Sequence, residues 1–458
     1  MIRPVPPAAA TRRGVIAAGA ATVALAGLGA LAPRAAHAVD IRTPATPGGL
    51  SYWLVEDRTA PVISIAFSFE GGSTLDPAGK EGVSQLVAAL LDQGAGPLDA
   101  NAFKARQDDT AVRFGFGAAV DRFGGSVRML AERRVESIEL LRLALAEPRF
   151  DAEAVERARR QTIVGLRRAE QSPGSVAGRV LATAVFGAHP YGRPASGTLE
   201  SVAAITAEDL RALAKSQFTR AGLTVAVVGD TTAAEIGPLL DRVFGALPAG
   251  GAPVDIPAWT PGAPKPGGRL IVVERDVPQS VVLLATPAIR RDDPDWYAAM
   301  LMNHVLGGAG FAGRLMTEVR EKRGLAYGAS SRLTPYKRAG LFSASVATAN
   351  ARVAESLAIV REQIALMAKD GVSDAELADA KTYLDGSLAV TLDSTGAIAN
   401  LLHGMRVDGL APDHLTRRKA LIDAVTKDAV KRVAARILRE DLSVTVVVGK
   451  PQGVTATE

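Results

Sequence analysis

Short apolar runs and helically spaced apolar residues alternate along the first half of the chain. The short runs alternate between apolar and polar positions or are apolar throughout, which is typical of strands. Apolar residues three and four positions apart indicate helices, and Thr206 followed by Asp209 is the pattern of a helix start. The sequence predicts strands at 50–54, 62–69 and 223–228, strands and a turn within 110–128, and helices at 83–91, 135–145, 152–168 (capped by Asp151) and from 206.

The second half repeats this order of elements. Thr206 and Thr426 are 220 residues apart, and so are Gly229 and Gly449, with similar residues between them. We therefore expect an α+β fold with two homologous domains, each a largely antiparallel sheet with helices packed on one face. The predicted elements of this half are strands at 270–273, 281–286, 341–346 and 444–448, and helices at 296–305, 353–368, 374–387 (capped by Ser373) and from 426.

A segment rich in proline and glycine separates the two halves. Residues 251–268 have the sequence GAPVDIPAWTPGAPKPGG and show no apolar period, which is typical of a linker. The expected domains are therefore residues 40–250 and residues 269–450.

Residues 1–38 have the pattern of an export signal. Arg12 and Arg13 precede an apolar segment rich in alanine and glycine, and Ala36-His37-Ala38 fits a small-x-small cleavage site. Cleavage there would leave Val39 first, and the paired arginines leave both the Tat and the Sec route open. An uncleaved membrane anchor is the alternative, although the segment is short and only mildly hydrophobic for one. We expect a periplasmic protein.

Composition limits the possible classes of function. The 458 residues are 48% hydrophobic and 22% charged, which suits a globular protein with more than one core. The absence of cysteine excludes disulfides and thiolate metal sites. Residues 1–38 hold four arginines and no acid, so removing them lowers the formal charge from +5 to +1. The basic pI is therefore no argument for nucleic acid binding.

The stretch from Leu306 to Tyr327, LGGAGFAGRLMTEVREKRGLAY, is the most informative in the chain. A glycine run is followed by a short helical pattern, which ends at Gly324 and leads into an extended segment. Arg320 near the helix end and Tyr327 on the strand can then reach the same side. Together they would offer fixed hydrogen-bond donors to a carbonyl oxygen. A plain capped helix feeding a strand gives the same pattern.

The glycine run also fits G-x-G-x-x-G at residues 308–313. A dinucleotide site requires a strand immediately before this motif, whereas residues 295–306 have the pattern of a helix. The sequence therefore argues against nucleotide binding.

The segment from Arg320 to Tyr327, R-x-x-R-G-L-A-Y, resembles the C-terminal domain of the insulinase and pitrilysin-like metallopeptidases, or inverzincins. The loop from His189 to Pro194, followed by Gly197-Thr198, is similar to another phrase of that family. The resemblance covers nearly the whole chain after residue 38. It implies that Arg320 and Tyr327 hold the substrate peptide.

The same resemblance implies a zinc motif, His-x-x-Glu-His, on a helix of the N-terminal domain, and a further glutamate on a later helix. Here the two histidine positions fall on Gln85 and Ala89, the general base falls on Ala88, and the later glutamate falls on Gly165. Methyl groups and a glycine cannot bind zinc or carry a proton. We expect no metal and no cofactor in this chain.

The histidines do not restore a metal site. They stand at positions 37, 189, 304, 403 and 414, and no two have ligand spacing. His37 would leave with the export signal, and the other four are expected to be structural.

The resemblance implies a substrate-binding subunit without zinc, in a periplasmic heterodimeric zinc endopeptidase. This chain would be inactive alone, and a homologous, zinc-bearing partner subunit would complete the site around an unfolded peptide. The alternative is a scaffold or peptide-binding protein that keeps the fold without enzymatic activity. A self-sufficient peptidase would need ligands that the sequence lacks.

Overall fold

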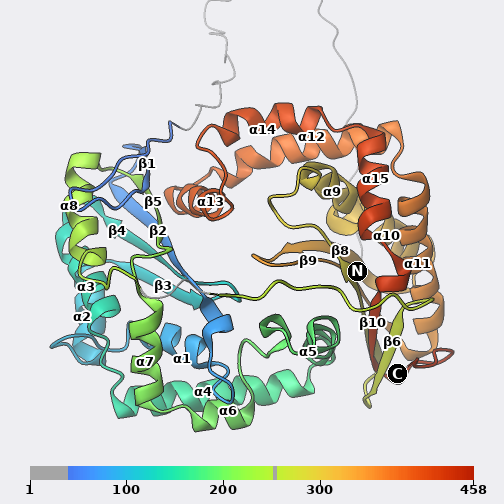
Figure 1. The fold of residues 1–458 in the computed structure, drawn as a ribbon, viewed down its shortest axis with the longest axis horizontal. Helices are drawn as coiled ribbons and strands as arrows, with labels where there is room; N and C mark the ends of the chain where they lie inside the picture. The colour runs from blue at the N-terminus through green and yellow to red at the C-terminus, as the bar shows by residue number, and fades with distance from the viewer. Residues whose placement is uncertain (1–39, 251–254, 458) are drawn as a thin grey trace, which may run out of the picture. The chain divides into compact units, whose positions relative to one another are not determined.

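The computed structural model describes residues 40–250 and 255–457, so the predicted export signal lies outside the described residues. Two five-stranded sheets organise this part of the chain (Figure 1). The first has the order β1-β5-β2-β4-β3 and the second the order β6-β10-β7-β9-β8. The strands are β1 (Trp53–Glu56), β2 (Val62–Glu70), β3 (Arg113–Ala118), β4 (Arg122–Leu130), β5 (Thr224–Gly229), β6 (Arg269–Glu274), β7 (Gln279–Pro287), β8 (Ala326–Pro335), β9 (Gly340–Ala349) and β10 (Val444–Gly449).

The two sheets have the same topology, which confirms the predicted repeat. In each, one pair is parallel (β1 with β5, β6 with β10) and the other pairs are antiparallel. Strands β5 and β10 are offset by 220 residues, as are α7 and α15. The predicted class, α+β with largely antiparallel sheets, is therefore correct.

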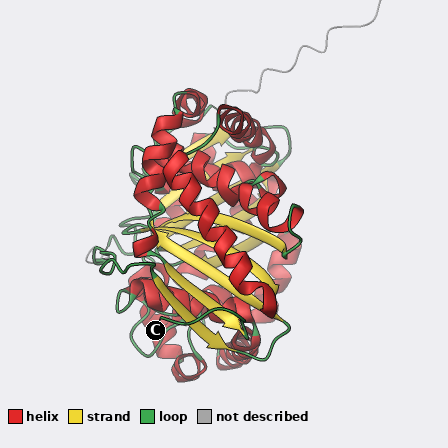
Figure 2. Ribbon diagram, turned by 90° about the vertical axis from the view of Figure 1, so that its right-hand side faces the viewer, coloured by secondary structure: helices red, strands yellow, loops and turns green. Residues whose placement is uncertain are grey.

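Helices surround both sheets, and Figure 2 shows helices lying across the strands from the side of α11 and α15. The first half contains α1 (Val83–Leu90), α2 (Ala100–Thr110), α3 (Arg134–Ala146), α4 (Ala152–Gln171), α5 (Pro173–Phe186), α6 (Leu199–Ala204), α7 (Ala207–Gln217) and α8 (Ala233–Phe244). The second contains α9 (Trp296–Asn303), α10 (Arg314–Met316), α11 (Val353–Asp370), α12 (Asp374–Thr391), α13 (Thr395–Val407), α14 (His414–Asp423) and α15 (Lys427–Ile437).

Each half supplies one helix to the sheet of the other half, which the pattern of apolar residues does not predict. Helix α13 packs on β2 and β5 of the first sheet, where Leu402 lies in one apolar cluster with Trp53 and Val228. Helix α5 packs on β7 and β10 of the second sheet. Both helices cover the sheet face opposite to the main core of that half. Each sheet thus has helices on both faces and not on one face as predicted, because the other half supplies a helix to the second face.

Helix starts follow the sequence with one correction. Thr206 and Ser373 cap α7 and α12 with reciprocal side-chain and backbone hydrogen bonds. Asp151 occupies the N-cap position of α4, but its side chain makes no cap hydrogen bond. Its carboxylate accepts a hydrogen bond from Arg149 Nε at 2.7 Å instead, so the nearby guanidinium replaces the helix N–H groups as its partner.

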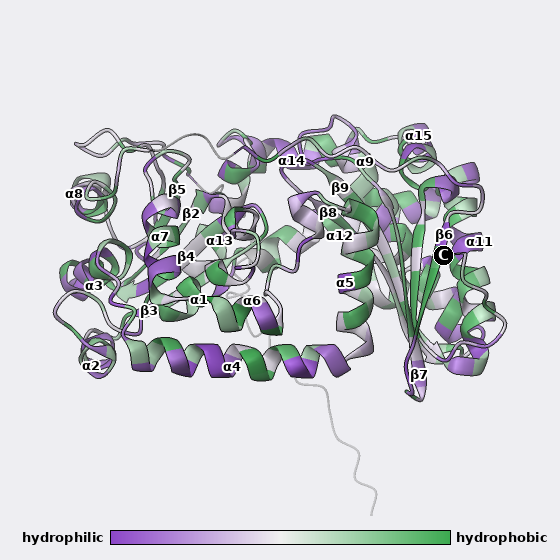
Figure 3. Ribbon diagram, turned by 60° about the horizontal axis from the view of Figure 1, so that its bottom comes forward, coloured by the Kyte–Doolittle hydropathy of each residue, from purple (hydrophilic) through white to green (hydrophobic). Residues whose placement is uncertain are grey.

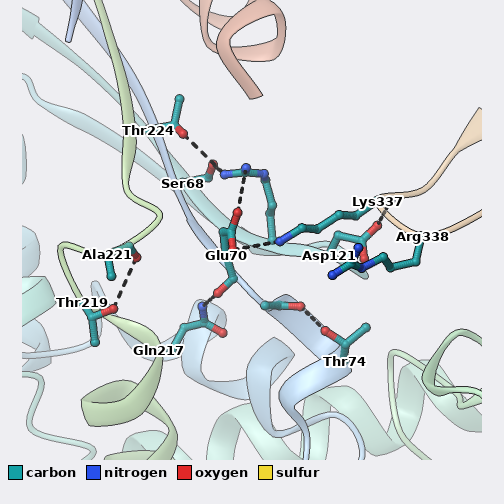
Figure 4. A network of polar contacts seen from close by, with 12 residues as sticks. Ser68, Glu70, Thr74, Asp121, Gln217, Thr219, Ala221, Thr224, Lys337 and Arg338 are labelled. Atoms are coloured by element: carbon teal, nitrogen blue, oxygen red, sulfur yellow. Dashed lines mark hydrogen bonds and ion pairs between the residues drawn. The ribbon is translucent and has the colours of Figure 1, made fainter. Parts of the chain in front are cut away.

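The tip of the β8–β9 hairpin joins the two halves through polar contacts (Figure 4). The backbone N–H of Lys337 donates to Asp121 Oδ2 at 2.9 Å, and Lys337 Nζ lies 2.9 Å from Glu70 Oε2. Tyr191, from the family-like loop, donates to Asp121 Oδ1 at 2.7 Å and accepts from the N–H of Arg338 at 3.0 Å. Burial and the Asp121 carboxylate raise the pKa of Tyr191. This loop therefore has a structural role between the halves.

Within the described ranges, no helix combines the length and the apolar character needed to cross a bilayer.

Candidate functional site

Arg320 and Tyr327 meet on the surface of the second half. Arg320 lies in a π-helical turn, Thr317–Glu321, and Tyr327 lies at the start of β8. The centre of the Arg320 guanidinium is 4.7 Å from the centroid of the Tyr327 ring. The predicted approach of these two residues across the helix-to-strand turn is correct. Gly324 makes that turn with a φ of 59°, a left-handed conformation that glycine adopts without strain.

Phe311 also contacts Arg320, although no pattern in the sequence points to it. Phe311 belongs to the glycine run, and the centroid of its ring lies 4.9 Å from the centre of the Arg320 guanidinium. Arg320 is therefore held between two rings, each within the range of a cation–π contact. Phe311 is 65% exposed and Tyr327 is 84% exposed. The two exposed rings thus form an aromatic surface on either side of the Arg320 guanidinium.

The charged neighbours of Arg320 are paired among themselves. Arg314 makes a two-pronged contact with Glu376, with Nε–Oε1 at 2.6 Å, and this contact lowers the Glu376 pKa to about 2. Glu318 accepts from Lys322 and from Arg323, both at 2.6 Å. Among residues 40–250 and 255–457, no hydrogen bond or ion pair engages the Arg320 guanidinium. Its N–H donors are thus positioned by the rings and available to a ligand.

The glycine run allows close packing behind Phe311. The position of a Cβ on Gly307 would lie 2.6 Å from the backbone nitrogen of Ser331, and one on Gly313 would lie 3.0 Å from Gly307 Cα. A side chain at Gly307 would push the run away from β8, and one at Gly313 would push against Gly307. The helix before the run, α9, confirms the sequence argument against a dinucleotide site, because that motif requires a strand there.

Three of the four positions assigned to the lost zinc motif line one pocket. Gln85 and Ala89 on α1 face Gly165 on α4 across a cavity of about 530 Å³. Ala88 lies on the same helix but is 7% exposed, in the main core of the first half. Gln85, Ala89 and Gly165 thus line one pocket from two different helices.

The side chains at this pocket do not fit zinc. Gln85 donates from Nε2 to the carbonyl oxygen of Ala118 at 2.6 Å, which ties its amide to the end of β3. Ala89 and Gly165 offer no ligand atom, and carboxylate, imidazole or thiolate is what zinc requires. Across the described ranges, no group of three histidine, aspartate or glutamate side chains is arranged to hold a metal ion.

Each histidine after residue 37 contacts another side chain or the backbone. His189 accepts from the N–H of Tyr191 through Nδ1, and His414 Nε2 lies 2.7 Å from the Tyr297 hydroxyl. His304 stacks on Tyr383 with ring centroids 4.6 Å apart. His403 on α13 lies 2.8 Å from Ser68 Oγ on β2, and burial lowers its pKa to about 4. All four therefore have contacts within the fold.

Comparison with known proteins finds a family model and a solved structure that match this chain. Residues 204–384 match the family model described as the peptidase M16 inactive domain. A crystal structure titled peptidase M16 inactive domain, from Pseudomonas fluorescens, is 31% identical, has a TM-score of 0.84, and covers 92% of this chain and 99% of that chain. The chain therefore shares its fold with that protein over most of the length of both chains.

Two curated relatives are also similar. An uncharacterized zinc protease of Streptomyces coelicolor is 32% identical over 61% of this chain, and the match spans about three fifths (61%) of that relative's own length. A non-peptidase homolog of Helicobacter pylori is 26% identical over 82% of this chain and 86% of that protein. The chain belongs to the M16 peptidase family, the insulinase and pitrilysin-like proteins, and carries the family's inactive domain.

Proposed function

We propose that this protein is the substrate-binding, non-catalytic subunit of a heterodimeric zinc endopeptidase, with Arg320 and Tyr327 as its contribution to the shared active site. One observation carries the proposal: an arginine held by two exposed rings, with its N–H donors unpaired in the described structure, stands in a chain whose zinc-motif positions hold no ligands. The partner is a zinc-bearing homologous subunit, and the export signal implies that both work in the periplasm.

The proposed roles follow from the donors. The Tyr327 hydroxyl donates to the carbonyl oxygen of the scissile peptide bond and to the oxyanion that develops from it. Arg320 donates to a neighbouring backbone carbonyl and holds the Tyr327 ring at its face. Zinc, in the partner, supplies the activated water. The substrate is an unfolded peptide, since both donors recognise backbone carbonyl groups that folded proteins use internally.

The test is peptide hydrolysis by this chain, by a zinc-bearing relative from the same organism, and by their mixture, with zinc analysis of each chain. We expect no zinc and no hydrolysis from this chain alone, and strong stimulation on mixing. Tyr327→Phe should lower the rate of the mixture by about 10²–10³-fold, as for loss of one oxyanion donor. Arg320→Ala should lower it similarly.

Arg332→Ala is the matched control, since Arg332 is an exposed arginine on the same strand, β8. It should leave the stimulation unchanged. Rates of the mixture that are insensitive to both Tyr327→Phe and Arg320→Ala would refute the proposal. A stable complex without any gain in hydrolysis would favour the scaffold function instead, and zinc with activity in the isolated chain would show that the active site lies elsewhere.

A further inference from the structure

The pocket between α1 and α4 has a composition suited to a ligand other than a metal. Its polar lining consists of Gln85, Gln93, Gln161, Arg157, Thr162 and Ser196. The rest of the lining is small or aliphatic. A volume of about 530 Å³ lies in the range of small-molecule and peptide side-chain sites. The pocket is therefore large enough for a ligand, and half of its lining residues carry hydrogen-bonding side chains.

The electrostatics of the pocket favour an anion. Arg157 is the only charged residue among the described residues that line it, so the lining carries one positive charge and no acid. Arg157 makes only two weak contacts. Its Nη2 donates to Gln93 Oε1 at 3.3 Å, and its Nη1 lies 3.6 Å from a carboxylate oxygen of Glu153, an exposed side chain outside the lining. An exposed pair of that length contributes little. The guanidinium can therefore exchange it for a carboxylate, which it binds through two parallel N–H groups.

Further donors surround the arginine. Gln161 on α4 lies one helical turn from Arg157, and Ser196 lines the pocket from the loop before α6. Neither side chain has a hydrogen-bond partner within the described ranges. Gly165 lies one turn further along the same face, and a Cβ there would meet no atom within 4 Å. The space above the helix is therefore open, and a ligand can lie along α4 between Gly165 and Arg157.

We propose that this pocket binds the carboxylate of a short peptide, with Arg157 as the pairing cation and Gln161 and Ser196 as flanking donors. The carboxylate can come from the peptide's C-terminus or from an acidic side chain. This inference is independent of Arg320 and Tyr327.

The test is a fluorescence anisotropy titration of the full chain with three dye-labelled pentapeptides that share one sequence of alanines and leucines. One has a free C-terminus and no acidic residue, one is amidated, and one is amidated with a central aspartate. We expect saturable binding of a carboxylate peptide and none of the plain amidated peptide. Arg157→Ala should weaken binding about tenfold or more, as for loss of a charge-assisted hydrogen bond.

Two matched pairs make the test specific. Arg160→Ala removes the same charge from an exposed position of α4 outside the lining and should change affinity less than about threefold. Gly165→Phe fills the open space and should abolish binding, whereas Gly386→Phe, in equally open space on α12, should not. Circular dichroism verifies that each variant is folded.

Several outcomes would overturn the inference: equal losses in Arg157→Ala and Arg160→Ala, binding that survives Gly165→Phe, or no difference between the carboxylate and amidated peptides. Arg320→Ala and Tyr327→Phe should leave the anisotropy titration unchanged. Failure of the carboxylate site is therefore separable from failure of the proposed subunit function, which is read from hydrolysis by the mixture.

Discussion

The Arg320 site shows how much one side chain depends on neighbours that a motif does not contain. Arg320 and Tyr327 can be read from the sequence, because the helix stop at Gly324 sets the spacing between them. Phe311 cannot, because its contact with Arg320 depends on how the glycine run folds back along β8, and glycine runs have no periodic pattern. The ring of Phe311 limits the motion of a long, entropy-rich side chain before any ligand binds.

Asp76 is a second residue whose environment matters more than its type. It is 3% exposed, and its carboxylate accepts from the backbone N–H groups of Gly82 at 2.7 Å and Ser84 at 3.2 Å, at the start of α1. Burial raises its pKa to about 6 even though these hydrogen bonds oppose the rise. The folded chain therefore binds this proton more tightly than the unfolded chain does.

Asp76→Asn should change the pH dependence of stability. A raised acid pKa stabilises the fold at pH values below the unfolded pKa of about 4, and this contribution is lost as the pH rises through about 6. We therefore compare the free energy of unfolding of the wild type with that of Asp76→Asn. The difference, wild type minus variant, should fall by about 3 kcal/mol as the pH rises from about 4 to above 6. Urea titrations at several pH values measure it, and a difference that is flat or rises with pH would contradict the assignment.

At the scale of elements, α1 and α4 form the walls of a site whose chemistry can be changed without moving the backbone. Gln85 and Ala89 are one turn apart on α1 and face Gly165 on α4. Gln85→His, Ala89→His and Gly165→Glu together should create a zinc site with micromolar affinity or tighter, because three ligands from two packed helices converge there.

Isothermal titration with zinc measures this gain. The control keeps both histidines and moves the glutamate to position 386 on α12, as Gln85→His, Ala89→His and Gly386→Glu. The control should bind zinc more weakly, by about tenfold or more, because its carboxylate is on another helix. Equal affinities would mean that Gly165 does not face the α1 pair closely enough to contribute a ligand.

Most elements follow from the pattern of apolar residues, and the failures have physical causes. The strands of both sheets and the helices α1, α3, α4, α7, α9, α11, α12 and α15 lie where the pattern predicts them. Helices α2, α5, α6, α8, α13 and α14 are not among the predicted helices. Helices α5 and α13 escape the pattern because they are apolar on more than one face, as expected of a segment buried against a sheet. Figure 3 shows α5 as mostly hydrophobic, in contrast with the mixed α4. The π-helical turn at Thr317–Glu321 departs from the 3.6-residue period on which prediction rests.

At the scale of the whole described chain, the exchanged helices make the two halves depend on each other. Leu402 on α13 is fully buried against the first sheet, although it belongs to the second half. Leu402→Ala should lower the free energy of unfolding by about 2–5 kcal/mol. Because α13 is continuous in sequence with the second half, we expect both halves to lose stability together in one transition.

Two variants that each keep a single tryptophan as a fluorescence probe test this expectation. Trp53 on β1 reports on the first half and Trp296 on α9 reports on the second. Leu402→Ala should shift the urea midpoints at both tryptophans equally. Leu366→Ala, at an exposed position of α11, should shift them much less. A shift confined to Trp53 would show that the halves unfold independently.

The helix exchange also sets the order of events during synthesis. The apolar face of α5 is complete once residue 186 has been made, but its partner strand β10 ends at residue 449, which is 263 residues later. At about 5–20 residues per second, the ribosome needs roughly ten seconds to a minute for that distance. During this interval the second sheet lacks β10, the strand between β6 and β7, so part of the apolar face of α5 stays uncovered until β10 has been made. A chaperone that shields apolar helices should therefore bind translation intermediates that contain α5 and release the chain only when β10 is finished.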